Sequence, residues 1–104
     1  MAEQLRVLAV DDEPPALDEL SYLLGRHPDI GEVVAVSDAT AALRVLGEQP
    51  LDAVFLDINM PGLSGLELAG VLVNFAAPPA LVFVTAHDDK AIADGLKLTG
   101  HFLS

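Results

Sequence analysis

The chain has 104 residues, of which 52% are hydrophobic and 5% aromatic, so it can bury one core built mainly of aliphatic side chains. Its 16 acidic residues against 5 Lys and Arg give a formal net charge of -11, which repels nucleic-acid phosphates and anionic membrane surfaces. Direct binding of nucleic acid by this chain is therefore not expected. The absence of cysteine excludes disulfides and thiolate metal sites.

Hydrophobic segments in this sequence are short. The N-terminal apolar run meets two carboxylates almost at once, unlike a signal peptide, and no stretch is long enough to cross a bilayer. We therefore expect one domain over residues 1–104 that works in the cytoplasm, a compartment that suits a chain without cysteine.

The first predicted unit is a strand followed by a helix. Residues 5–10 form an apolar run typical of a buried strand. Pro14 and Pro15 then mark the start of a helix that ends near Gly25 and Pro28. Its inward face is predicted by leucines at helical spacing: Leu17, Leu20, Leu23 and Leu24.

The second predicted unit repeats this order. Residues 33–36 form a short apolar strand, and residues 38–46 show a helical pattern. Ser37 or Asp38 is the expected N-cap, because both side chains accept hydrogen bonds from free N–H groups at a helix start. The side chains expected to face inward are Ala42, Leu43 and Leu46.

The second half of the chain continues the alternation. A third strand is expected at 51–56, and a Ser-x-x-Glu capping box starts a helix at about Ser64. A fourth strand follows at 81–84, then a weaker helix at 88–98 and the start of a fifth strand at 101–103. Because these strands are apolar on nearly every residue, they predict a parallel sheet covered on both faces.

The predicted fold class is therefore α/β, a doubly wound, flavodoxin-like parallel sheet of five strands in the order 2-1-3-4-5. In such sheets a ligand binds beyond the carboxyl ends of the strands, where the strand order reverses. Here that point lies between the first and third strands.

Carboxylates stand at both of these strand ends. Asp11 and Asp12 follow the first strand and Asp57 ends the third, so the predicted strand order brings their carboxylates together. A bound divalent cation would relieve the repulsion among them. Mg²⁺ is the expected cofactor, with Asp12, Asp57 and the main-chain carbonyl of Asn59 as direct ligands and Asp11 acting through water. Asp57 could also act as a nucleophile that forms an aspartyl-phosphate, and the Thr85 hydroxyl, after the fourth strand, could bond a phosphoryl oxygen.

Three segments, at residues 10–13, 55–65 and 82–86, resemble the site segments of response-regulator receiver domains at matching spacing. The resemblance implies that Asp57 accepts a phosphoryl group from a sensor histidine kinase, that Asp11 and Asp12 form the acidic Mg²⁺ pocket, and that Thr85 senses phosphorylation. The segments DDEPPAL and VTAHDDKAI are most similar to the corresponding segments of receivers that precede a LytTR-type DNA-binding domain. This resemblance implies a part in transcription regulation.

The match weakens after about Ile92. Phe102 takes the place of the family's aromatic switch residue, but the family's Lys, the Pro after it and its fifth helix would follow Ser104, where this sequence stops. With that helix missing, apolar side chains of the third to fifth strands are expected to lie open to water. Self-association, as a dimer or by exchange of a segment, is then expected.

Other interpretations of these residues remain open. Asp12 and Glu13 could simply cap the helix that starts at Pro14, Thr85 could be a turn residue, and Phe102 an ordinary strand residue. The chain could also be a receiver-like interaction module that is phosphorylated poorly without the Lys. A Mg²⁺-dependent phosphohydrolase fits less well, because the haloacid-dehalogenase class places an Asp-x-Asp motif after its first strand.

Overall fold

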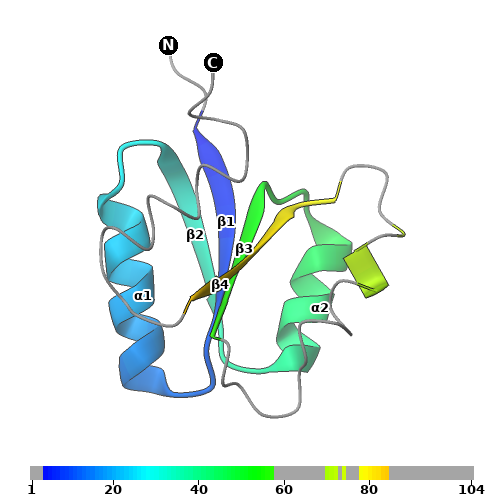
Figure 1. The fold of residues 1–104 in the computed structure, drawn as a ribbon, viewed down its shortest axis with the longest axis horizontal. Coiled ribbons are helices and arrows are strands. Elements are labelled where there is room, and N and C mark those ends of the chain that lie inside the picture. Colours follow the sequence, from blue (N-terminus) through cyan, green and yellow to red (C-terminus); the bar gives the residue numbers. More distant parts are fainter. Residues whose placement is uncertain (1–3, 58–69, 73, 75–77, 85–104) are drawn as a thin grey trace.

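The computed structural model describes residues 4–57, 70–72, 74 and 78–84. In this part of the chain, parallel strands form one sheet in the order β2-β1-β3-β4 (Figure 1). The strands are β1 (Leu5–Val10), β2 (Ile30–Val36), β3 (Ala53–Asp57) and β4 (Ala80–Val84). The order confirms the doubly wound α/β fold, and the predicted fifth strand lies outside the described residues.

The helices α1 (Pro14–Arg26) and α2 (Ala39–Glu48) cover opposite faces of this sheet (Figure 1). The alternation of β1 side chains explains the two layers. On one face Val7 and Ala9 pack with Leu20 and Leu24 of α1. On the other face Leu8 and Val10 pack in one cluster with Ala42 and Leu46 of α2. The central strands β1 and β3 are therefore buried on both faces along most of their length, which is why nearly all of their residues are apolar.

Strand β2 begins earlier than the predicted residue 33. The N–H of Leu5 donates to the carbonyl of Asp29 (2.8 Å), and pairing with β1 then runs from Ile30 to Val36. The register shifts by one residue at Gly31, which forms a bulge. Gly31 and Glu32 have low strand propensity, so only the pairing with β1 places them in the strand.

Helix α2 confirms one part of its prediction and corrects another. Asp38 is the N-cap, and its Oδ1 accepts the N–H of Ala41 at 2.7 Å. Leu43, however, is 40% exposed and does not face inward. The inward face of α2 passes through Ala42 and Val45, and Leu43 lies at its edge because each residue turns the helix by about 100°.

On the sheet face beneath α1, the side chains of β3 and β4 are buried, although the sequence led us to expect them to be exposed. Ala53 and Phe55 of β3 are fully buried, and Val82 and Val84 of β4 are 4% and 2% exposed. The expectation of an open apolar surface on these two strands is therefore wrong. The large exposed side chain of β4 is Phe83, which alternates to the other face.

Only fragments of the later elements belong to the described residues. Residues 70–72 are helical, in agreement with a third helix, and Leu72 packs in the cluster beneath α2. The predicted start of that helix at Ser64 and the whole predicted fourth helix lie outside them. Within the described part of the chain, no helix has the length and apolar character that a bilayer crossing requires.

Candidate metal and phosphoryl site

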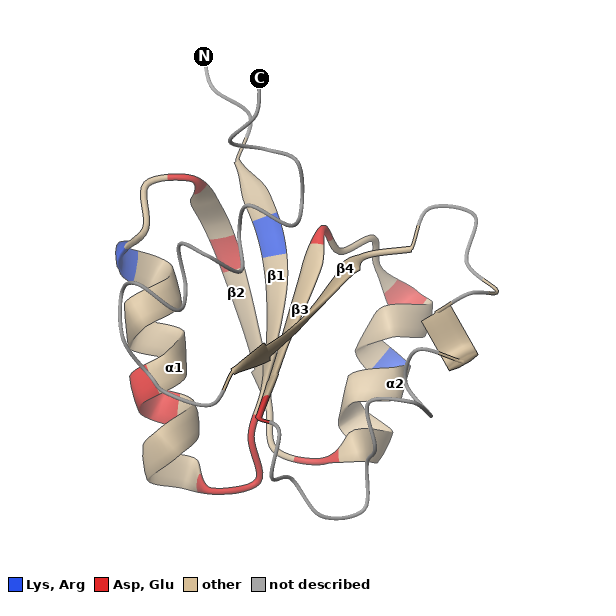
Figure 2. Cartoon of the chain, in the orientation of Figure 1, with Lys and Arg blue, Asp and Glu red and all other residues tan. Residues whose placement is uncertain are grey.

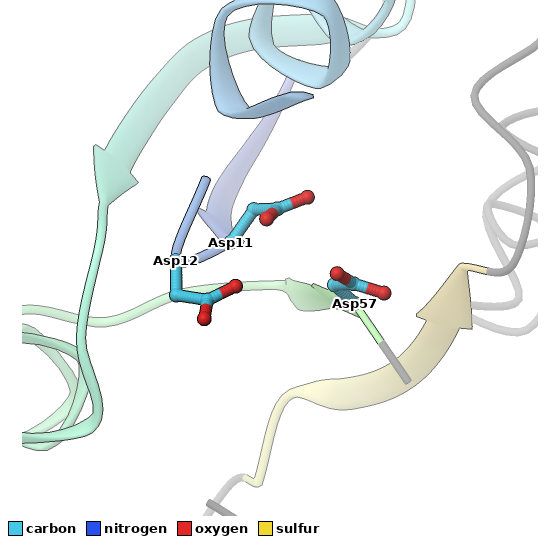
Figure 3. Close-up of side chains that lie close together, drawn as sticks. All are labelled: Asp11, Asp12 and Asp57. Atoms are coloured by element: carbon cyan, nitrogen blue, oxygen red, sulfur yellow. The ribbon is translucent and has the colours of Figure 1, made fainter. Parts of the chain in front are cut away.

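Three carboxylates meet at the carboxyl end of the sheet. Asp11 and Asp12 follow β1, and Asp57 is the last residue of β3. The register pairs Val10 with Leu56, so the chain leaves both strands at the same level. One ligand oxygen from each of the three lies within 4.8 Å of the others (Figure 3). The sequence-based prediction that these acids converge agrees with this arrangement.

Asp11 is held by the backbone around it. The residue is only 1% exposed, and its N–H donates to the carbonyl of Val36 at the end of β2 (3.3 Å). Its Oδ1 accepts the N–H of Glu13 at 3.0 Å, a turn in which an Asp bonds the backbone two residues on. This bond fixes the orientation of the buried carboxylate. This bond was not predicted from the sequence, although an Asp two residues before the N-cap of a helix was the available signal.

Asp12 is exposed, and no hydrogen bond or ion pair with another described residue holds its side chain. Glu13 is the N-cap of α1, but its side chain makes no capping hydrogen bond. Pro14 and Pro15 occupy the first two helical positions and have no N–H to be capped. Helix capping therefore does not account for the Asp12 and Glu13 carboxylates.

Asp57 is half-buried, and its backbone continues the ladder between β3 and β4, where it pairs with Val84. This pairing fixes the main chain of Asp57 from the β4 side. Its side chain thus stands on a strand end, between the acids after β1 and the end of β4.

Repulsion among these carboxylates has to be relieved. At about 5 Å and an effective dielectric constant of about 20, each ionised pair repels by roughly 3 kcal/mol, and by less where water reaches Asp12. The Arg side chains of the described residues lie elsewhere: Arg6 is the second residue of β1, Arg26 ends α1, and Arg44 is within α2. Figure 2 shows acidic residues gathered at the carboxyl end of the sheet without a basic residue among them.

The donor set suits a hard divalent cation. It consists only of carboxylate oxygens, the ligands that Mg²⁺ prefers. Ligand oxygens of one Mg²⁺ octahedron are at most about 4.2 Å apart, since each bond is about 2.1 Å. The limit of 4.8 Å found here is close to that span, so a small closure, or one carboxylate bound through water, completes the fit.

Three further predicted site residues fall outside the described part of the chain. They are Asn59, Thr85 and Phe102. Their predicted parts in metal binding, phosphoryl contact and switching therefore stay predictions.

Comparisons with known proteins identify the family to which this chain is similar. A family model described as the response regulator receiver domain matches residues 7–101. Over 88 residues the chain is 41% identical to the sensory transduction protein LytT of Enterococcus faecalis, an alignment that covers 85% of this chain and 36% of LytT. The chain thus spans about a third of the length of the curated relatives it matches.

Two solved structures extend the comparison to the fold. The crystal structure of the response regulatory domain of protein MrkE from Klebsiella pneumoniae matches 90% of this chain, and 76% of its own, with a TM-score of 0.68 and 37% identity. A chain in the crystal structure of the histidine kinase ThkA in complex with the response regulator protein TrrA matches 82% of this chain, and 72% of its own, with a TM-score of 0.66 and 33% identity.

Proposed function

This chain belongs to the response regulator receiver domain family of two-component signalling systems, and from that premise we propose that it accepts a phosphoryl group on Asp57 with the help of Mg²⁺. The observation that carries the proposal is the meeting of Asp57 with Asp11 and Asp12, with ligand oxygens within 4.8 Å of one another. Asp57 would then offer one carboxylate oxygen as the nucleophile, in a pocket where it binds the metal together with the other acids.

In the proposed reaction a carboxylate oxygen of Asp57 attacks the phosphorus of a phosphohistidine on the donor. The O–P bond forms as the P–N bond breaks, and the imidazole nitrogen keeps the electron pair and takes up a proton. Asp12 and Asp57, with the carbonyl of Asn59, would bind the metal directly, and Asp11 through water. Bound Mg²⁺ would offset the negative charge of the phosphoryl oxygens.

Two residues outside the described part complete the proposal by resemblance. Thr85 follows directly after Val84, the residue that pairs with Asp57, and its hydroxyl would bond a phosphoryl oxygen. Phe102 would be the aromatic residue that changes position with phosphorylation. The output of this switch would be a change in conformation or in association state.

The proposed phosphodonor is a sensor histidine kinase in the cytoplasm. Resemblance to the transcriptional regulatory protein LytR of Staphylococcus aureus, to which the chain is 35% identical over 88 residues, supports a part in transcription regulation. The chain itself, with a net charge of -11, would not bind nucleic acid. The proposed self-association has the side chain of Phe83, which is 45% exposed, as the contact to test. Light scattering should show weaker association for Phe83→Ser than for the parent.

Intact-mass measurement tests the central step. With acetyl phosphate and Mg²⁺, the parent chain should gain the mass of one phosphoryl group, and Asp57→Asn should gain none. Asp52→Asn is the matched control, because Asp52 lies just before the amino end of β3, whereas Asp57 is at its carboxyl end. Phosphate on Asp57→Asn, or none on the parent with the donor and metal in excess, would rule out the proposal.

A further inference from the structure

The turn between β1 and α1 treats its two aspartates differently. An Asp side chain commonly accepts hydrogen bonds from the backbone N–H groups two and three residues further on. For Asp11 the first of these belongs to Glu13, and the bond forms at 3.0 Å. For Asp12 the two positions are Pro14 and Pro15, neither of which has an N–H.

Both prolines sit at the start of α1, where their lost donors are not needed for helix hydrogen bonds. The first intrahelical bond runs from the N–H of Leu17 to the carbonyl of Glu13, at 2.9 Å. The two prolines therefore cost the helix little. Their combined effect falls on Asp12, which is exposed and makes no hydrogen bond or ion pair with another described residue.

We propose that Pro14 and Pro15 are positioning residues for the metal site, because they withhold the two backbone donors that would otherwise engage the Asp12 carboxylate and so leave it to the metal. This inference rests on the proposed function, since it assumes that Mg²⁺ binds between Asp12 and Asp57. Any ordinary residue at positions 14 and 15 would supply N–H groups at the positive end of the α1 dipole, where they would compete with the cation for Asp12.

The test is a Mg²⁺ titration of the double variant Pro14→Ala/Pro15→Ala and of the parent. Binding is monitored by the amide chemical shifts of residues at the carboxyl ends of β1 and β3. A capped Asp12 should bind Mg²⁺ about three to ten times more weakly, in line with the strength of a helix N-cap. Pro28→Ala is the matched control, because Pro28 is an exposed proline beyond the other end of α1. It should leave the affinity unchanged.

A second arm separates positioning from a general effect on the fold. In an Asp12→Ala background, the two Pro→Ala changes should no longer alter the Mg²⁺ affinity, because their target is gone. With acetyl phosphate, the proline variant should label slowly at low Mg²⁺ but reach the parent rate at saturating Mg²⁺. A rate that stays low at saturation would instead point to a disturbed Asp57 and would overturn the inference.

The remaining outcomes keep the two proposals apart. If the parent binds Mg²⁺ and the proline variant binds it equally well, the inference is wrong while the proposed function stands. If the affinity falls by the same factor with and without Asp12, the prolines act on the fold alone and the inference is again wrong. If the parent shows no Mg²⁺ binding at the β1 and β3 ends, both proposals are overturned.

Discussion

Both ends of the sheet carry acidic residues, but the two sets are arranged in opposite ways. At the amino end, Glu32 forms an ion pair with Arg6 (2.5 Å) across β1 and β2. The Asp52 side chain accepts the N–H of Arg6 (2.8 Å). The Asp52 N–H donates to the carbonyl of Arg6, and the Asp52 carbonyl accepts the N–H of Ala80. At the carboxyl end, Asp11, Asp12 and Asp57 approach one another instead. Acids at the first end join strands, whereas those at the second end gather at the expense of stability.

The largest expected effect is at Asp11, the buried acid of the carboxyl end. Asp11→Asn removes one charge from the cluster and keeps an oxygen that can accept the N–H of Glu13. Without divalent cations, the free energy of unfolding should rise by about 1–2 kcal/mol, because part of the repulsion disappears. Urea denaturation measures this change. Asp11→Ala, which loses the acceptor as well, should gain less, and a loss of stability in Asp11→Asn would contradict the comparison.

Asp52 should respond in the opposite direction. Asp52→Ala leaves the N–H of Arg6 without its side-chain acceptor, so the free energy of unfolding should fall by about 1 kcal/mol. Asp52→Asn keeps an acceptor oxygen and should recover most of this loss in the same urea experiment. Equal destabilisation by both substitutions would mean that charge, and not the hydrogen bond, explains the role of Asp52.

The strands of this comparison were predictable to different degrees. Residues 5–10 were predicted with the correct bounds because a run that is apolar except for Arg6, and that ends at Asp11 and Asp12, is a local signal. The start of β2 was not, because Gly31 and Glu32 join the strand only through pairing with β1, which is far away in the sequence. Leu43 was misplaced because the sequence gives the period of a helix more reliably than the edge of its buried face.

The candidate site was predictable where it depends on topology. A parallel order with β1 beside β3 was enough to bring Asp11 and Asp12 to Asp57. The hydrogen bond from Glu13 to Asp11 and the contrasting position of Asp12 depend on the path of one turn, which strand order does not define. Asn59, Thr85 and Phe102 lie outside the described residues and stay predictions.

The smallest expected effect concerns Glu32 at the amino end. Its side chain is 51% exposed and that of Arg6 is 44% exposed, so water screens their ion pair. Glu32→Gln should lower the free energy of unfolding by only about 0.2–1 kcal/mol, and high salt should remove most of that difference. A larger, salt-independent loss would show that the amino end depends on this pair more than its exposure suggests.

The most direct test of the account is whether Mg²⁺ stabilises the chain through the carboxyl end alone. Unfolding is measured with and without Mg²⁺ for the parent, for Asp52→Asn and for Asp12→Asn/Asp57→Asn. At a Mg²⁺ concentration of about ten times the dissociation constant, a ligand of the folded state adds about 1.4 kcal/mol. We expect this gain for the parent and for Asp52→Asn and its loss in the double variant. An equal gain in all three proteins would contradict a metal site at the carboxyl end of the sheet.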